Sequence, residues 1–302
     1  MLYKVNAIVL GGKDIGEADK IITLYSKERG KIKAVAKGVR KMKSKFGSSL
    51  EPFILSSLLI YSKNDSIRQT RPTRGIMDSS LDIVSDAQIQ NSFRNLRKDI
   101  AGLAYGNFLV ELVCRMTGEG ESGGHKIFHL LREFLSLGEE LKNMKVLIYG
   151  FTLRFFSLSG YCPQLEECVG CGSTLVPKVG TLEVPKVGSL PKLGPLEGEG
   201  EERDSSKIKA GKELNFSVNQ GGILCNVCKE KDRGALPISI SSLQYLRQLM
   251  KMGSRYLKNL KISLYCEEEL ENIVQDYFNF YLERSIESLS FFKQITEAKC
   301  HI

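Results

Sequence analysis

The first 75 residues alternate apolar with polar positions, which is the pattern of half-buried β-strands. Five short runs are rich in β-branched and aromatic residues, at residues 3–10, 19–26, 31–37, 53–61 and 66–74. Two glycine-containing turns, Asn64-Asp65 and a longer loop over residues 38–52 separate these runs. Five short strands with one long loop predict a small closed barrel, and the OB-fold is the commonest barrel with this number of strands.

From residue 78 onward the apolar positions recur with a helical period. Helices are expected at residues 86–116, 125–137, 144–158, 241–252 and 268–292. Pro237 and the pair Ser241-Ser242 are residues that commonly precede or begin a helix, and they indicate the start of the fourth helix. The predicted fold class is therefore α+β with two domains, namely an OB-fold nucleic-acid-binding domain at residues 1–77 and a helical domain at residues 78–302. A chain of 302 residues that is 42% hydrophobic is long enough for two cores.

Two cysteine pairs, Cys168-x-x-Cys171 and Cys225-x-x-Cys228, have the spacing of zinc knuckles. Two knuckles brought together supply four thiolates, which close a tetrahedral Zn²⁺ site and leave no position for a catalytic water. We therefore expect one structural zinc ion, held by a zinc ribbon at residues 162–230 that is inserted in the helical domain. The alternatives are four free cysteines or two disulfides. Cys162 is the only plausible substitute ligand.

The separation between the pairs is wide, with 53 residues between Cys171 and Cys225, whereas about 15 to 20 are usual. Three near copies of a Val-Pro-Lys-Val-Gly pentapeptide begin at residues 176, 184 and 190, and an acidic run follows them. A segment of this composition buries too little apolar surface to offset the entropy of ordering it. Residues 176–213 are therefore expected to be a disordered insert, whose removal would leave 15 residues between the pairs.

Positive charge is concentrated in the predicted barrel, because residues 1–75 carry 16 Lys and Arg against 6 Asp and Glu. Charge at this density repels itself unless an anion binds nearby. Strand alternation predicts a basic strip, with Lys31, Lys33 and Lys37 on one face, which continues into the 38–52 loop. A solvated surface is the plainer alternative; we favour phosphate binding. The expected nucleic-acid-binding residues are Lys31, Lys33, Lys37, Arg40, Lys41, Lys43, Lys45, Arg71 and Arg74.

No catalytic residues are predicted, and the chain is expected not to be an enzyme. His125 and His129 have the i, i+4 spacing of a metalloprotease pair, but Lys126 stands where that motif needs its glutamate base. The sequence also has no Gly-x-x-x-x-Gly-Lys-Ser/Thr phosphate loop. It shows no export signal, and its uncharged runs fall short of the roughly 18 residues that a membrane span requires. A cytoplasmic protein without membrane contact is expected.

The order of several motifs resembles the RecO family of bacterial DNA repair and recombination mediator proteins. The resembling segments are residues 16–24, 30–40 and 44–53, Arg154 with Gly160-Tyr-Cys-Pro163, Cys168-x-x-Cys-Gly172, and Gly221-Gly-Ile-Leu-Cys-x-x-Cys228. The resemblance covers most of the chain except the insert. It implies an N-terminal OB-fold, a helical C-terminal domain and, in many members, a zinc ribbon.

The resemblance also implies a function. Such proteins bind single- and double-stranded DNA, anneal complementary strands and help to load RecA onto DNA coated with single-strand-binding protein. The implied partners are DNA, RecR, the acidic tail of single-strand-binding protein and, indirectly, RecA, at the bacterial nucleoid. DNA contact is carried onto Lys37, Arg40, Lys41, Lys43 and Lys45, and metal ligation onto the four knuckle cysteines. The alternative is a zinc-ribbon DNA-binding scaffold or transcription-associated protein without annealing activity.

Overall fold

The computed structural model describes residues 1–62, 81–120, 124–140, 143–175, 214–251, 253–257 and 260–282, and residue 288. The chain divides into two compact units. The first, called the barrel unit below, combines Met1–Cys162, Gln248–Ser263 and Val274–Ile302. The second, called the cysteine unit, combines Pro163–Arg247 and Leu264–Ile273. Within the described ranges, no helix has the length and hydropathy needed to cross a bilayer.

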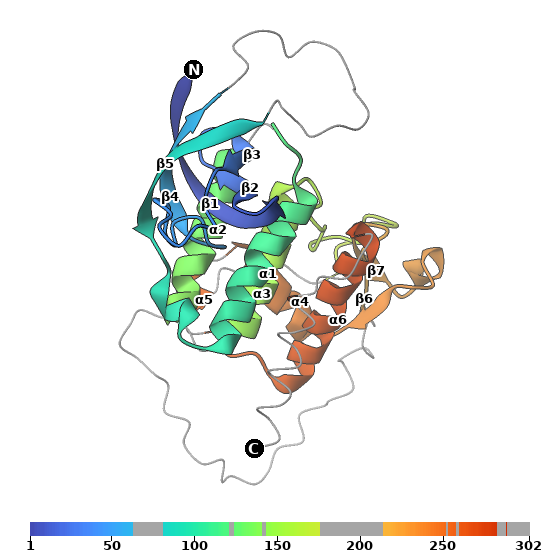
Figure 1. Ribbon diagram of the computed structural model, residues 1–302. Helices are drawn as coiled ribbons and strands as arrows, with labels where there is room; N and C mark the ends of the chain where they lie inside the picture. Colours follow the sequence, from blue (N-terminus) through green and yellow to red (C-terminus); the bar gives the residue numbers. More distant parts are fainter. Residues whose placement is uncertain are drawn as a thin grey trace, which may run out of the picture. The chain divides into compact units, whose positions relative to one another are not determined.

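The barrel unit begins with a closed β-barrel (Figure 1). Its strands are β1 (Leu2–Ile15), β2 (Asp19–Ser26), β3 (Gly30–Ala36), β4 (Leu55–Tyr61) and β5 (Asp82–Asn91), in the spatial order β1-β2-β3-β5-β4. Neighbouring strands are antiparallel except β3 and β5, which close the barrel in parallel. This five-stranded closed barrel confirms the predicted OB-fold.

The core of the barrel is filled by small and medium apolar side chains from all five strands and by two residues of the long β3–β4 connection. The two residues of the connection are Phe46 and Leu50, and both are almost fully buried. The strand residues of this core are Val5, Ala7, Val9, Ile22, Leu24, Ala34, Ala36, Leu58, Ile60 and Val84. Because Phe46 and Leu50 are anchored in the core, the connection is tied to the barrel at its middle as well as at its ends.

Two sequence-based boundaries in the barrel are wrong. Strand β1 does not end before Gly11-Gly12 but continues to Ile15, because a bulge between Val9 and Gly11 lets the glycines remain paired with β2. The helix expected from residue 86 begins only at Ile100, since residues up to Asn91 form β5. The barrel therefore extends beyond residue 77. The strand expected at residues 66–74 lies outside the described residues.

A bulge explains why β5 was mistaken for a helix. The β4–β5 register shifts between Leu59 and Ile60, so that Leu59 pairs with Asp86 and Ile60 pairs with Val84. Val84 and Ala87 consequently both face the core although they are three residues apart. A spacing of three between inward residues is the signature of a helix, and here an extra strand residue produces it.

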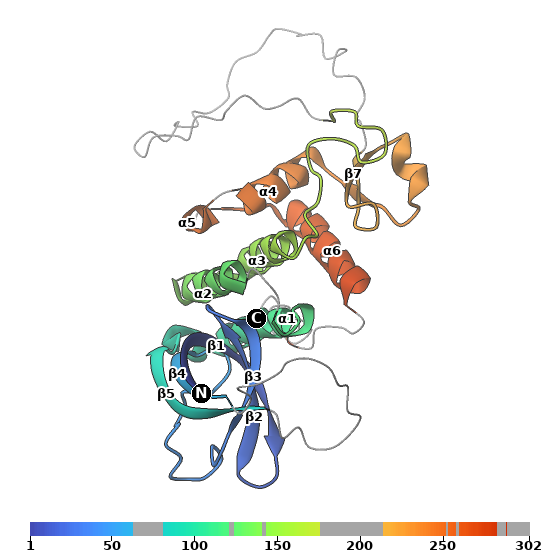
Figure 2. The ribbon, with the colours of Figure 1, turned by 90° about the horizontal axis from the view of Figure 1, so that it is seen from above.

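Three helices complete the described core of the barrel unit. They are α1 (Ile100–Met116), α2 (Gly124–Glu140) and α3 (Met144–Leu158), preceded by the short 3-10 helix η1 (Arg94–Arg97). Figure 2 shows α1 and α2 beside the barrel with α3 packed on their far side. Asp99 caps α1 by accepting a 2.6 Å hydrogen bond from the Gly102 N–H. Gly138 permits close packing of α2, because a Cβ there would lie 2.4 Å from the Tyr105 ring. The short α5 (Ser254–Leu257) also belongs to this unit.

The cysteine unit contains a small three-stranded sheet, in the order β7-β6-β8. Its strands are β6 (Leu214–Ser217), β7 (Gly222–Cys225) and β8 (Leu236–Ile238), with the 3-10 helix η3 (Cys228–Lys231) after β7. The helices α4 (Ile240–Lys251) and α6 (Leu264–Tyr281) begin in this unit. Ser239 caps α4 by accepting from the Ser242 N–H at 3.1 Å, so the helix begins at Ile240, one residue before the predicted range.

The sheet and the knuckle residues follow α3 and precede α4 in the chain, as predicted. The expected insert at residues 176–213 lies outside the described residues.

Candidate metal centre and nucleic-acid interface

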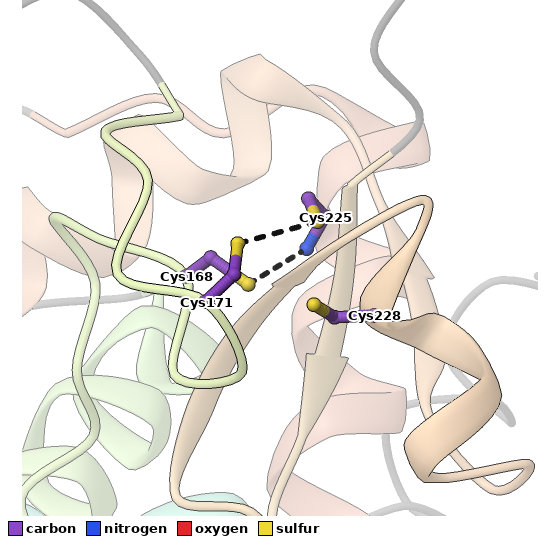
Figure 3. Close-up of side chains that lie close together, drawn as sticks. All are labelled: Cys168, Cys171, Cys225 and Cys228. Atoms are coloured by element: carbon purple, nitrogen blue, oxygen red, sulfur yellow. Dashed lines mark hydrogen bonds between the residues drawn. The ribbon is translucent and has the colours of Figure 1, made fainter.

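Two knuckles bring the four predicted cysteines together (Figure 3). In the first, the Gly172 N–H donates to the Cys168 carbonyl at 2.8 Å, and the Cys168 N–H donates to the Ser173 carbonyl at 2.9 Å. Gly172 has φ +72°, a left-handed conformation that glycine adopts without strain. In the second knuckle, Cys225 ends β7 and Cys228 begins η3. The first knuckle is held beside β7, because the Val169 N–H donates to the Ile223 carbonyl at 2.9 Å and the Cys225 N–H donates to Cys168 Sγ at 3.3 Å.

The four sulfur atoms all lie within 4.8 Å of one another. The distance from Cys171 Sγ to Cys225 Sγ is 3.9 Å. A tetrahedral ion with Zn–S bonds of about 2.3 Å would place its sulfurs roughly 3.8 Å apart, so the cluster needs only a small contraction. The packing leaves little space beside it, because a Cβ on Gly170 would lie 2.8 Å from Cys228 Sγ. The cluster has the size and ligand set of a closed metal site.

Within the cluster, the surroundings of Cys171 favour the thiolate form and those of Cys228 favour the thiol form. Hydrogen bonds from the Ser173 hydroxyl and N–H lower the pKa of the Cys171 thiol to about 6. Burial acts to raise the pKa of Cys168, but backbone N–H groups that donate to its sulfur lower the pKa overall. Burial and the neighbouring sulfurs raise the pKa of Cys228 to about 12. Four thiolates in this volume repel one another, so full ionisation requires a cation among them.

Cys162, the predicted substitute ligand, is not among the four clustered sulfurs of the described chain. It is exposed and ends the first segment of the barrel unit, whereas the four clustered cysteines belong to the cysteine unit. The four clustered ligands therefore come from the two knuckles alone, and Cys162 is not one of them.

The second candidate site is an exposed segment at residues 37–45, called the basic loop below. Backbone hydrogen bonds fold it into successive turns, from the Lys41 N–H to the Gly38 carbonyl and from the Ser44 N–H to the Lys41 carbonyl. The Gly38 N–H also donates to the Asp19 carboxylate at 2.7 Å, which ties the loop to β2. Five basic side chains of the loop are exposed, namely Lys37, Arg40, Lys41, Lys43 and Lys45.

The five side chains differ in their intramolecular contacts. Arg40 lies 3.4 Å from the Asp14 carboxylate, and Lys45 donates to the Ser85 carbonyl at 2.6 Å. Lys37, Lys41 and Lys43 form no side-chain hydrogen bond or ion pair with any residue that the structure describes. These three ammonium groups are therefore available to an anion in solution.

Lys31 and Lys33 lie on the outer face of β3, as predicted, but their charges are used within the protein. The Lys31 ammonium donates to the carbonyls of Cys114 and Thr117, at 2.5 and 2.7 Å, at the C-terminal end of α1. Lys33 lies 2.7 Å from the carboxylate of Glu119. Nothing local in the sequence indicates either contact, because the partners follow the lysines by more than 80 residues. The predicted basic strip is thus interrupted along β3.

Two other predicted residues, Arg71 and Arg74, lie outside the described residues. The sequence analysis also missed Lys13 and Lys20, which lie on the β1–β2 hairpin next to the basic loop. Lys13 is exposed, and Lys20 lies 3.8 Å from Asp14. Lys13 was missed because β1 was expected to end at residue 10, and the run Gly11-Gly-Lys-Asp-Ile15 has no alternation that would have extended the strand.

These features define a class, namely an OB-fold protein with an exposed basic loop, a helical region and a four-cysteine cluster that can hold a metal ion. Family models agree with this architecture along the chain. Residues 1–74 match the model described as recombination protein O N terminal, and residues 97–181 and 202–290 match recombination protein O C terminal. The chain therefore belongs to the recombination protein O (RecO) family, a family of DNA repair and recombination mediators.

Relatives support this assignment over nearly the full chain. A protein of Desulforamulus reducens named "DNA repair protein RecO" is 28% identical, with 97% of this chain and 95% of the relative covered. A protein of the same name from Pelotomaculum thermopropionicum is 29% identical, with 98% and 96% covered. The match to the C-terminal family model omits residues 182–201, which fall within the predicted insert. The resemblance inferred from the motif order is confirmed.

Proposed function

We propose that this protein binds single- and double-stranded DNA and anneals complementary strands during DNA repair. The observation that carries the proposal is the basic loop, in which Lys37, Lys41 and Lys43 are exposed and unpaired among the described residues. Ammonium groups that neutralise phosphates release condensed counterions, which favours binding at low and moderate salt. We propose that Arg40 and Lys45 contribute at the edges of the same surface, with Arg71 and Arg74 as further candidates.

Annealing needs charge screening and strand proximity, because base pairing itself supplies the free energy. The outer face of β2 and β3 presents Ile21, Thr23 and Val35 between the lysines, and the one aromatic residue of these strands, Tyr25, is buried. Exposed aromatic side chains are the usual platform for base stacking. Their absence from this described face favours contacts to the phosphate backbone, with little dependence on base sequence.

We propose that one Zn²⁺ ion is held by Cys168, Cys171, Cys225 and Cys228. The four-sulfur donor set and the dimensions of the cluster support this choice over a hard cation, which prefers oxygen ligands. A bound ion would neutralise the thiolates and join the two knuckles. With four protein ligands it would leave no position for water, so its role would be structural.

The proposed partners follow from membership of the RecO family. They are RecR, the acidic tail of single-strand-binding protein and, indirectly, RecA, which the protein would help to load onto coated DNA. Relatives whose names give DNA repair as their role support the setting of this proposal.

The test is the annealing of complementary oligonucleotides coated with single-strand-binding protein, either intact or lacking its acidic tail. We expect annealing of the naked strands and of strands coated with the intact protein, and slower annealing when the tail is removed. Absence of annealing in all arms would contradict the proposed function. Binding that competition with unrelated DNA fails to displace would instead favour a sequence-specific scaffold.

A further inference from the structure

Two groups of exposed basic residues lie on either side of β3, whose own lysines are engaged within the protein. One is the basic loop, which follows the end of β3. The other precedes the start of β3 and is called the second surface below. It combines Lys27 of the β2–β3 turn with the exposed face of α2, which carries His125, Lys126, His129 and Arg132.

Close packing brings the two parts of the second surface together. A Cβ on Gly124, the first residue of α2, would lie 2.7 Å from Gly30 Cα in the β2–β3 turn. His125, His129 and Arg132 follow at i, i+4 and i+7, so they share one helix face. The opposite face is buried through residues such as Ile127 and Phe134. Figure 2 shows α2 running beside the barrel strands.

Positive charge outnumbers negative charge on the second surface, where Lys27, Lys126 and Arg132 lie beside the carboxylates of Glu28 and Glu133. Lys27, Lys126 and Arg132 make no side-chain hydrogen bond or ion pair with described residues. Glu28, the acid in the turn, is engaged by Asn6 through two hydrogen bonds of 3.1 Å. Glu133, the acid next to Arg132 in α2, interacts electrostatically with Arg154.

The pKa of His129 reports the same accumulation of charge. Partial burial lowers this pKa below its usual value, and the charges of Arg132, Lys27 and His125 lower it further. A phosphate placed among these groups would relieve their mutual repulsion.

The length of β3 separates the two surfaces. Six residue steps lead from Gly30 to Ala36, which corresponds to roughly 20 Å along a strand. Lys31 and Lys33, between them, are held by the end of α1 and by Glu119. One compact unit thus presents two basic surfaces with no free ammonium on β3 between them.

We propose that the second surface binds the phosphate backbone of a second DNA strand while the basic loop holds the first. This inference rests on the proposed function and gives it a geometry in which one chain receives both strands. Each strand would be screened by its own cations, so the two backbones could approach without sharing counter-charges.

The test uses two non-complementary labelled oligonucleotides, so that base pairing cannot bridge them. Native mass spectrometry would count strands per chain for the wild-type protein and for the variant K27Q/K126Q/R132Q. We expect the wild type to form a complex of one chain with two strands. The variant should keep its first-strand affinity within about twofold and lose about tenfold in second-strand affinity, since three phosphate contacts are removed.

A control variant, R94Q/K98Q/R233Q, removes the same charge at other exposed positions and should behave as the wild type. One strand per chain in the wild type, or unchanged second-strand affinity in K27Q/K126Q/R132Q, would overturn the inference even if the protein anneals DNA. Failure of the wild type to bind any strand would instead contradict the proposed function.

Discussion

The sequence predicts that Lys31 contacts DNA, but its ammonium group forms hydrogen bonds within the protein. It donates to two carbonyls at the C-terminal end of α1, where the helix dipole favours a cation. We predict that Lys31→Met lowers the free energy of unfolding by about 1 kcal/mol and changes DNA affinity less than twofold. Urea denaturation and fluorescence anisotropy measure the two effects. The control is Lys41→Met, for which the affinity should fall and the stability should not; the same result for both variants would contradict the assignment.

His129 is expected to make the affinity for the second strand depend on pH. Partial burial, and then the charges of Arg132, Lys27 and His125, disfavour the protonated imidazole, so the pKa of His129 lies below the usual value. A bound phosphate favours the protonated form, and linkage then requires tighter binding as the pH falls through this pKa. We predict that second-strand affinity increases between pH 7.5 and 5.5 and that His129→Gln reduces the increase. An identical pH profile in the variant would exclude this role for the histidine.

At the scale of elements, the basic loop presents exposed lysines on a backbone that is held at both ends. Its turns are tied to β2 through Asp19, and Phe46 anchors its far end in the core. We predict that changing Lys37, Lys41 and Lys43 together to Gln weakens single-strand binding and reduces the slope of log K against log salt by about 2, since each lost phosphate contact contributes about 0.7. Affinity measured over a salt series tests this. A slope equal to that of R94Q/K98Q/R233Q would show that the loop does not contact phosphate.

The elements also show what local sequence can and cannot predict. Strand β2, helix α3 and the four knuckle cysteines were predicted from periodicity and spacing, because those signals are local. The position of β5 was not, because a bulge gives Val84 and Ala87 a helical spacing. The ion pair between Lys33 and Glu119 could not be predicted either, because it depends on tertiary packing between distant segments. Local patterns therefore identified the candidate residues, and long-range contacts decided which charges remain available.

At the scale of the whole molecule, metal and folding should be linked in the cysteine unit. If one zinc ion joins the two knuckles, its binding free energy contributes to stability, by about 2.7 kcal/mol when free zinc is about 100 times Kd. We predict one zinc per chain by elemental analysis, and loss of stability of the cysteine unit after chelation or in Cys228→Ser. Cys162→Ser should keep the metal, because its sulfur is outside the cluster. A metal-free protein with unchanged stability after chelation would contradict the structural role.

The central claim is that the barrel unit anneals DNA through the basic loop. The most direct measurement is the rate of annealing of complementary oligonucleotides at fixed salt, compared for the wild type, K37Q/K41Q/K43Q and the charge-matched variant R94Q/K98Q/R233Q. We expect rapid annealing by the wild type and by the charge-matched variant, and about tenfold slower annealing when the loop lysines are removed. Equal rates for all three proteins, or no acceleration over the protein-free reaction, would contradict it.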